Sequence, residues 1–321
     1  GGMYDQFAGG FFRYSTTRDW SIPHFEKMLY DNAQLIPAYL RHGREDFRQT
    51  AINAGDHLLR DLRLTVVAGD NLPEGAAAFA TGEDADDPAG EGSFYAWSPA
   101  QLNEVLGAQA GTEIAHAWAI SDGKREHGHS EPAVNHIPHP RATGMVTNRS
   151  AWEPLLPRLR FARDARPRPG RDDKALTDQN ALALEAFAWL GRLTGEARFI
   201  TAARELANFL RTRVTASGVL RLAHRPAYIT DYGALVCGLT AAFDLLGDAV
   251  FVERVDGSLV GLQPVDEVGG HLGEVGRYRR FGIRALDDKL VEVFVEDIAH
   301  DLDQKIGLTV QQRGSLDTLE S

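Results

Sequence analysis

The sequence predicts a mainly α-helical fold, an α/α toroid of helical hairpins with a few short strands. Apolar residues recur at spacings of three and four over residues 23–43 and again over 45–64, with one short turn between the two runs. The same pattern returns over residues 177–214, where Gly195 divides it into a second pair of helices. A helical hairpin buries its apolar face only against another hairpin, which favours a ring of such pairs.

The individual elements follow in chain order. Pro23 is expected in the first turn of the first helix, because proline fits that position. Thr177 or Asp178 is expected to cap the third helix, and residues 230–246 form a further apolar helix. The β-prone segments 93–97, 218–224 and 289–298 are expected to be strands.

The helical period fades after Gly247, which predicts two parts. Residues 1–248 form the toroid-like domain, and residues 249–321 form a divergent tail or a small α/β extension of unknown role. We expect that the tail does not complete the ring. Apolar surface on helices 24–42 and 230–246 then needs cover from the tail, from a second copy of the chain or from another domain.

Composition narrows the class of protein. The 321 residues include 34 Lys and Arg against 45 Asp and Glu, a net charge of −11, which argues against nucleic acid or an anionic membrane as partner. The single cysteine, Cys237, cannot form an internal disulfide and suits a reducing compartment. No run approaches ~20 consecutive apolar residues, and no basic and then apolar leader is present. We therefore expect a soluble, cytoplasmic protein that needs no cofactor.

Four blocks in order resemble one known family. They are "GGMYDQFAGGFFRYSTTRDWSIPHFEKMLYDNAQL", "EDADDPAGEGSFYAWSPAQLNEVLG", "DDKALTDQNALALEAFAWLGRLTGE" and "ITDYGALVCGL". They resemble the helical part of the spermatogenesis-associated thioredoxin-domain proteins and their bacterial YyaL-like relatives. The resemblance covers residues 1–246 and implies a six-hairpin toroid similar to glycosidases and to the N-acylglucosamine 2-epimerase group. Family members carry a thioredoxin-like domain and further toroid helices ahead of this region, so we expect an incomplete ring and a thioredoxin-like domain as one candidate partner.

The first block offers polar groups suited to a sugar. Arg13 presents a planar set of donors and Tyr14 a hydroxyl. The family usually has a histidine where this chain has Phe12. The alternative is that Arg13 pairs with Asp19 or Glu26 and only fixes the loop.

The segment "IPHFEKMLYDN" brings four polar side chains together at the expected start of the first helix. The positive end of the helix dipole would lower the pKa of His24 and leave a neutral imidazole able to act as a base. Glu26 and Lys27 follow it, Asp31 lies one turn after Lys27, and Trp20 precedes the segment as a stacking surface. The alternative is that His24 and Glu26 cap the helix while Lys27 and Asp31 form an exposed pair.

The acidic stretch over residues 83–91 predicts a second catalytic carboxylate. An inverting glycosidase uses two carboxylates about 6.5–9.5 Å apart, and Asp86 is the candidate here. The resemblance implies that Asp84, Asp86 and Glu91 are loop residues facing the mouth of the ring. Tyr95 and Trp97 complete an aromatic platform. A calcium loop and a solvated acidic loop are the alternatives, and the register of an EF-hand is absent.

The block "DDKALTDQN" supplies the remaining candidates. Asp173 is expected to act as an acid, and Asn180 lies on the first turn of the helix that follows. Gln179 replaces a tryptophan of the family. His224, and Asp231 with Tyr232, are expected to face the same mouth of the ring.

The histidine-rich segment is expected to hold no metal. His127, His129, His136 and His139 have ligand-type spacings, but prolines surround them and the pattern has a high false-positive risk.

These observations lead to two hypotheses. In the first, the domain epimerises, isomerises or hydrolyses a small saccharide, with His24, His224, Asp173 and Asp86 moving protons and Arg13 orienting an oxygen. In the second, it is a non-catalytic binding or interaction module whose partner is a thioredoxin-like domain. Convergence of these groups in one aromatic-walled pocket would favour the enzyme, and mutual pairing of the same groups would favour the module.

Overall fold

The computed structural model describes residues 2–67, 69, 72–120, 152–215 and 217–247, together with four two-residue strands further along the chain. The chain divides into two compact units, one of Gly1–Arg213 with Leu220–Gly247 and one of Val214–Val219 with Asp248–Ser321. The histidine-rich segment and the expected strand 289–298 lie outside the described residues.

The first unit is mainly helical, as expected. Its helices are α1 Leu29–Arg41, α2 Glu45–His57, α3 Pro99–Leu106, α4 Ala108–Ala117, α6 Leu156–Asp164, α7 Thr177–Thr194, α8 Ala197–Arg211 and α9 Ile229–Leu246. Two short elements extend helices, the π-helix η1 Leu58–Leu62 after α2 and the 3-10 turn η3 Glu153–Leu155 before α6.

Short antiparallel strands connect these helices. β1 Tyr14–Ser15 pairs with β2 Pro23–His24, and β4 Arg63–Leu64 pairs with β5 Ala78–Phe79. β3 Lys27–Met28, β6 Gly82–Glu83 and β7 Arg171–Asp172 form one three-stranded sheet with β6 in the middle. β9 Gly218–Leu222 pairs with β10 Arg225–Pro226 and, at its other edge, with β8 Val214–Thr215. In the second unit, β11 Arg254–Val255 pairs with β12 Ser258–Leu259, and β13 Gln263–Pro264 pairs with β14 Phe281–Gly282.

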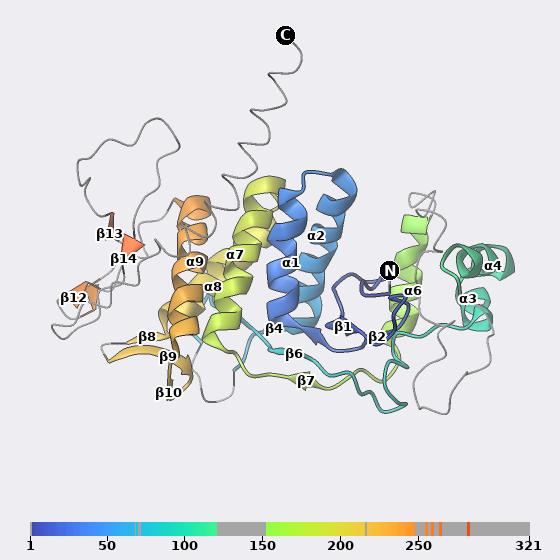
Figure 1. The fold of residues 1–321 in the computed structure, drawn as a ribbon, viewed down its shortest axis with the longest axis horizontal. Coiled ribbons are helices and arrows are strands. Elements are labelled where there is room, and N and C mark those ends of the chain that lie inside the picture. Colours follow the sequence, from blue (N-terminus) through green and yellow to red (C-terminus); the bar gives the residue numbers. More distant parts are fainter. Residues whose placement is uncertain are drawn as a thin grey trace, which may run out of the picture. The chain divides into compact units, whose positions relative to one another are not determined.

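α7 is the central helix of the first unit. It packs against α1 on one side and α9 on the other, and α2 and α8 complete the two hairpins (Figure 1). Ten of its residues are buried, and Gly195 ends it with a left-handed φ of 69°. The prediction of helical hairpins divided at Gly195 is therefore confirmed.

The first helix is shorter than its apolar spacing predicts. It begins at Leu29, after Met28 in an extended conformation, and Pro23 lies in β2. The expected helical turn at Pro23 is wrong because the backbone of 23–28 is paired with other segments, β2 with β1 and β3 with β6. His24, Glu26 and Lys27 therefore do not lie in the first turn of a helix.

Two other local predictions are corrected. α7 begins at Thr177, so neither Thr177 nor Asp178 is its N-cap; the cap is Leu176, which has no capping side chain. The segment 93–97 forms turns, not a strand, because Asp87 accepts hydrogen bonds from the Ser93 hydroxyl and the Phe94 N–H and wraps the chain around itself. The strand expected over 218–224 is confirmed as β9.

A second apolar cluster lies around α3, α4 and α6. Trp97, Trp118 and Phe7 are at its centre, and Phe7 contacts both indole rings edge-on. This cluster ties the N-terminal loop to the helices that follow the acidic stretch.

α9 is the least covered of the long helices. By length and mean hydropathy (1.3) it meets the criteria for a membrane span, and 28% of the tested window is buried. A core helix of a soluble protein meets the same criteria, so one such helix is weak evidence for a membrane.

Candidate functional site

The sheet β3–β6–β7 separates two groups of charged side chains. Lys27, Glu83 and Arg171 are direct neighbours across its strands, so their side chains leave on one face. Met28, Gly82 and Asp172 are neighbours one residue further along and belong to the opposite face. The face that carries Lys27 and Glu83 covers the core, except at the edge strand β7, where both Arg171 and Asp172 are exposed.

The sheet also fixes where two helices begin. α1 starts directly after β3, α7 starts five residues after β7, and these two helices pack together. Figure 1 shows β6 and β7 running across the ends of the helices at which α1 and α7 start. Polar groups on this sheet therefore lie beside the first turns of the two helices.

A cavity of about 310 Å³ lies over this sheet. Its lining is formed by Glu26, Met28, Thr81, Gly82, Glu83, Asp84, Gly170, Arg171 and Asp172. Four of these residues carry carboxylates and one carries a guanidinium group. Arg171 is held by both carboxylate oxygens of Asp173 and by the Asp61 carbonyl, so its charge is already used within the protein.

Glu26 connects the cavity to a chain of ionisable groups. Arg13 donates to Glu26 Oε2 at 2.7 Å, and His24 Nε2 lies 3.3 Å from the same oxygen. The other ring nitrogen of His24 lies 2.9 Å from Glu91 Oε1, and the ring stacks on Tyr14. The hydrogen bond to Glu26 raises the pKa of Arg13 above its ordinary value. The imidazole is thus held between two carboxylates, and the alternative prediction that Arg13 pairs with Glu26 is confirmed.

Asp31 is the carboxyl group of this region with a perturbed pKa. It lies in the first turn of α1, and its Oδ2 is buried and accepts no hydrogen bond from the described part of the chain. Burial raises the pKa of Asp31; Arg13 opposes this, and the like charge of Glu26 adds to it. When two neighbouring carboxyl groups lie in different environments, their pKa values differ, and one can act as an acid while the other acts as a base.

On the core face, Asp5 binds two buried cations. Lys27 Nζ and Arg163 Nη1 each lie 2.7 Å from Asp5 Oδ2, and the N–H groups of Phe7 and Ala8 donate to Oδ1. Burial by itself would raise the pKa of Asp5, but Arg163 and Lys27 hold it well below its usual range. Lys27 is only 1% exposed and also donates to the Gly9 carbonyl. The predicted substrate-binding role of Lys27 and its pairing with Asp31 are therefore wrong.

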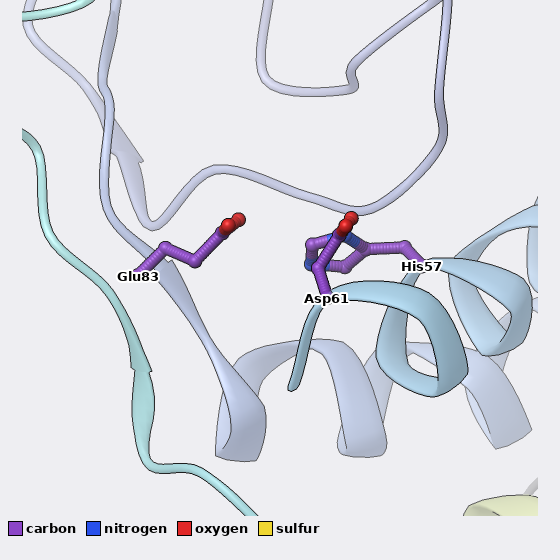
Figure 2. A group of neighbouring side chains, drawn as sticks. All are labelled: His57, Asp61 and Glu83. Carbon is purple, nitrogen blue, oxygen red and sulfur yellow. The ribbon is translucent and has the colours of Figure 1, made fainter. Parts of the chain in front are cut away.

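A second buried group gathers His57, Asp61 and Glu83 (Figure 2). His57 Nδ1 lies 2.8 Å from Asp61 Oδ2, one helical turn away, where α2 passes into η1. Burial lowers the pKa of His57, and the charge of Lys27 adds to this effect. The ring is therefore neutral at ordinary pH, and the hydrogen bond to the carboxylate places its proton on Nδ1.

The predicted aromatic platform does not line the cavity. Tyr95 and Trp97 are 4% and 1% exposed, and their rings pack in the apolar clusters around Phe12 and Phe7. Trp20 is 60% exposed and takes a left-handed φ of 62° in the loop between β1 and β2. Tyr95 and Trp97 are thus corrected to core residues.

The other predicted proton-transfer groups lie outside the cavity lining. Asp173 binds Arg171, Asp86 is exposed on the loop after β6, and His224 is exposed in the turn between β9 and β10. The cavity is lined instead by Asp172, the neighbour of Asp173, and by Asp84, which the resemblance places at the mouth of the ring together with Asp86 and Glu91. Asp172 ends the two-residue strand β7, whereas Asp173 follows the strand and pairs with Arg171, and the sequence does not show where so short a strand ends.

Two predicted binding residues hold the backbone together. Asn180 is fully buried and bonds both the N–H and the C=O of Phe79. Asp231 is fully buried, receives the Asp178 and Tyr228 N–H groups, and pairs with Arg221. Neither has a polar atom free for a ligand, so both are corrected to structural residues. Tyr232, the next residue of α9, is partly exposed, and its role stays a prediction.

Sequence reasoning missed the residues that meet only in three dimensions. Asp5, Arg163, His57, Asp61 and Met28 were not singled out. The one local signal among them is the four-residue spacing of His57 and Asp61, which places both on one face of a helix.

The chain is similar to known proteins over most of its length, although no family model matches it. It is 29% identical over 287 residues to human Spermatogenesis-associated protein 20, a match that covers 79% of this chain and 35% of the human protein. The rat protein of the same name is 29% identical over 289 residues, and an uncharacterized protein of Caenorhabditis elegans is 26% identical over 272 residues. The chain spans 35% of the length of each of these relatives. The similarity to spermatogenesis-associated proteins expected from the four blocks is confirmed at this level.

Two solved structures align with this chain over most of its length. Cellobiose 2-epimerase from Spirochaeta thermophila aligns with a TM-score of 0.25 and 18% identity, over 77% of this chain and 60% of the epimerase. A glycoside hydrolase family 76 mannosidase from Bacteroides thetaiotaomicron aligns with a TM-score of 0.23 and 9% identity, over 70% of this chain and 56% of the mannosidase. Both TM-scores are low, so neither structure identifies the function of this chain.

Proposed function

We propose that this domain binds a small saccharide in the cavity over β3–β6–β7 and acts on it by acid–base chemistry. The observation that carries the proposal is the shared lining: Glu26, Asp84 and Asp172 border one cavity of about 310 Å³. Glu26 in turn lies 3.3 Å from the imidazole of His24, and its charge acts on Asp31. Carboxylates accept hydrogen bonds from sugar hydroxyls, and acid–base pairs near a sugar ring serve hydrolysis and epimerisation alike.

The roles follow from the contacts of each group. Glu26 and His24 form the proton-transferring pair, because they lie 3.3 Å apart and Glu26 reaches the cavity. Asp31 does not itself line the cavity, so it acts through Glu26 as a proton reservoir, because burial favours its protonated form and the charge of Glu26 acts on it. Arg13 orients Glu26, and Asp84 binds a hydroxyl group at the rim. Asp172 borders the cavity while its carboxylate is paired with Lys174. Asp84 Oδ1 is already turned towards the Ala85 N–H, which leaves its other oxygen for a ligand.

Deuterium exchange separates the two reactions that this site could support. The chain is incubated in D₂O with neutral mono- and disaccharides, and the products are read by NMR. An epimerase or isomerase exchanges the proton of the carbon next to the carbonyl, whereas a hydrolase gives a cleaved disaccharide without that exchange. Glu26→Gln is expected to reduce either rate by at least about a hundredfold, in line with the loss of one acid–base group. Asp86→Asn is the matched control, because Asp86 carries the same charge nearby but does not line the cavity.

One observation favours the competing function, a non-catalytic binding module. Arg13, Glu26, His24 and Glu91 already bond one another, as expected of groups that only fix a loop. Isothermal calorimetry against the same saccharides distinguishes the two. Binding without turnover, with Glu26→Gln as tight as the parent, would support the module and contradict the enzyme.

A further inference from the structure

Two buried hydrogen-bond acceptors lie close together, His57 Nε2 and the carboxylate of Glu83. Neither receives a hydrogen bond of ordinary length from the described part of the chain. His57 is fully buried, and its Nε2 has no hydrogen-bond partner in the described part of the chain. Because Nδ1 carries the proton shared with Asp61, Nε2 presents a lone pair. A buried polar atom left in this state costs about 1–3 kcal/mol.

Glu83 is the other underbonded group. It is 5% exposed, and its closest contacts are the Tyr95 hydroxyl at 3.4 Å and the Arg168 guanidinium at 3.8 Å. Both are longer than a charge-assisted hydrogen bond of about 2.7–2.9 Å. Lys27, its partner across the strands, is already bound to Asp5. The carboxylate of Glu83 is therefore buried with only the Arg168 guanidinium at 3.8 Å and the charge of Lys27 acting on it, and neither makes a short hydrogen bond to it in the described part of the chain.

These two groups converge on one point. One nitrogen of His57 and one carboxylate oxygen each of Asp61 and Glu83 lie within 4.8 Å of one another. Figure 2 shows the carboxylate of Glu83 directed towards the His57 ring from a different element of the fold. Ligands of one tetrahedral ion bound at about 2.0–2.2 Å are about 3.4 Å apart, so a small movement of the flexible Glu83 side chain would close the set.

We propose that His57 Nε2 and Glu83 bind a divalent transition-metal ion of the zinc class, with Asp61 orienting the imidazole. Asp61 is assigned this outer role because its oxygens are already occupied: Oδ1 accepts from Arg168 at 3.0 Å and Oδ2 faces His57 at 2.8 Å. Arg60 bonds both oxygens as well. A metal-bound histidine commonly donates its other ring N–H to a carboxylate, which fixes the tautomer and the orientation of the ring.

The chemistry of the ligands selects the ion. A neutral water could donate to both acceptors, but it would leave Glu83 with only the Arg168 guanidinium at 3.8 Å and the more distant charge of Lys27, whereas a dication binds the carboxylate directly. Calcium and magnesium prefer sets of oxygen ligands, so an imidazole nitrogen favours zinc or a similar ion. The positive charges of Lys27, Arg60 and Arg168 oppose the ion. Asp5 pairs with Lys27, and the side chains of Arg60 and Arg168 are partly exposed to solvent, which screens their charge.

Zinc titration of the whole chain tests the proposal. Metal is removed with a chelator, and Zn²⁺ is then added in a calorimeter and in a thermal-unfolding assay. His127→Ala, His129→Ala, His136→Ala and His139→Ala are combined in the parent chain, so that the histidine-rich segment does not contribute. We expect one equivalent of Zn²⁺ to bind and to raise the melting temperature, and Ca²⁺ to do neither.

Matched variants decide which residues hold the ion. Glu83→Gln and His57→Gln are expected to abolish Zn²⁺ binding, and Asp61→Asn to weaken it by about 10–100-fold. His42→Gln is the control, because His42 is an exposed histidine whose ring contacts Phe47 and is not part of this group. Circular dichroism establishes that each variant is folded, and Glu83→Gln, which keeps the shape of the side chain, remains informative if His57→Gln does not fold. Absence of binding, or binding that survives Glu83→Gln, would overturn the proposal. Neither result depends on whether the cavity binds a saccharide.

Discussion

Asn32 and Asn180 make the same three hydrogen bonds in two different helical hairpins. Asn32 receives the Phe11 N–H at 2.7 Å and donates to the carbonyls of Phe11 and Met28. Asn180 receives the Phe79 N–H at 2.8 Å and donates to the carbonyls of Phe79 and Leu176. Each is the fourth residue of its helix, α1 or α7. The two neighbouring helices therefore bind a passing backbone segment in the same way, α1 at Phe11 and α7 at Phe79.

Removing either asparagine is expected to destabilise the fold. Asn180→Ala leaves both polar groups of the Phe79 backbone unpaired in the core, at about 1–3 kcal/mol each. Asn32→Ala should cost a similar amount through Phe11. Asn208→Ala is the control, because that exposed amide only donates to the Gly75 carbonyl and should change the free energy of unfolding by less than about 0.5 kcal/mol. Urea unfolding measures all three, and equal values for Asn180→Ala and Asn208→Ala would contradict the assigned role.

Asp5 is expected to matter more for stability than its partner Lys27. Asp5→Asn leaves two cations, Lys27 and Arg163, buried without a counter-charge, which costs about 3–5 kcal/mol. Lys27→Met should cost less, because Arg163 and the Phe7 and Ala8 N–H groups still satisfy Asp5. Chemical denaturation of the two variants gives the ranking, and a larger loss for Lys27→Met would refute it.

Acid should destabilise the protein through the same carboxylate. The pKa of Asp5 is held well below that of the unfolded chain, about 3.9, so folding binds fewer protons at this site. The resulting stability is present above pH 4 and is lost as the pH falls below it. Asp5→Asn lacks this contribution, and its melting temperature should therefore fall less steeply between pH 5 and pH 3 than that of the parent. Parallel curves would show that Asp5 does not supply the effect.

The titration of Asp31 should respond in opposite directions to two nearby substitutions. Arg13 lowers the pKa of Asp31 and Glu26 raises it, while burial raises it most. Arg13→Gln is therefore expected to move this pKa further up, and Glu26→Gln to move it down. Carboxyl-carbon NMR follows the titration directly. Shifts of the same sign in both variants would mean that the two charges do not act on Asp31 as placed here.

Anionic saccharides should bind more weakly than neutral ones. The cavity is lined by Glu26, Asp84 and Asp172, and its guanidinium group is occupied by Asp173. Glucose 6-phosphate is expected to bind at least about tenfold more weakly than glucose, a difference of about 1.4 kcal/mol that shrinks at high salt. Asp84→Asn should narrow the gap and Asp86→Asn should leave it unchanged. Calorimetry at two ionic strengths gives both comparisons, and a preference for the phosphate would remove the assigned selectivity.

Much of the helical framework follows from the sequence because helix formation is local. Apolar residues at spacings of three and four locate α1, α2, α7, α8 and α9, and Gly195 marks a boundary through its own backbone conformation. The sequence also placed Arg13 beside Glu26 as one of two alternatives. The prediction of a helical start at Pro23 is wrong because it also rests on local spacing. The apolar spacing continues through Phe25, but the backbone on either side of it is paired with other strands.

The tertiary structure alone decided the site. A strand of two residues has no periodicity to read, so the sequence could not show that Asp172 faces the cavity and Asp173 does not. Arg163 reaches Asp5 across 158 positions, and Glu83 on β6 comes within 4.8 Å of His57 at the end of α2. Such contacts form when separate elements pack together and bury their charged side chains. The local sequence determines the residue type and the local structure of each partner, but not which residues come into contact.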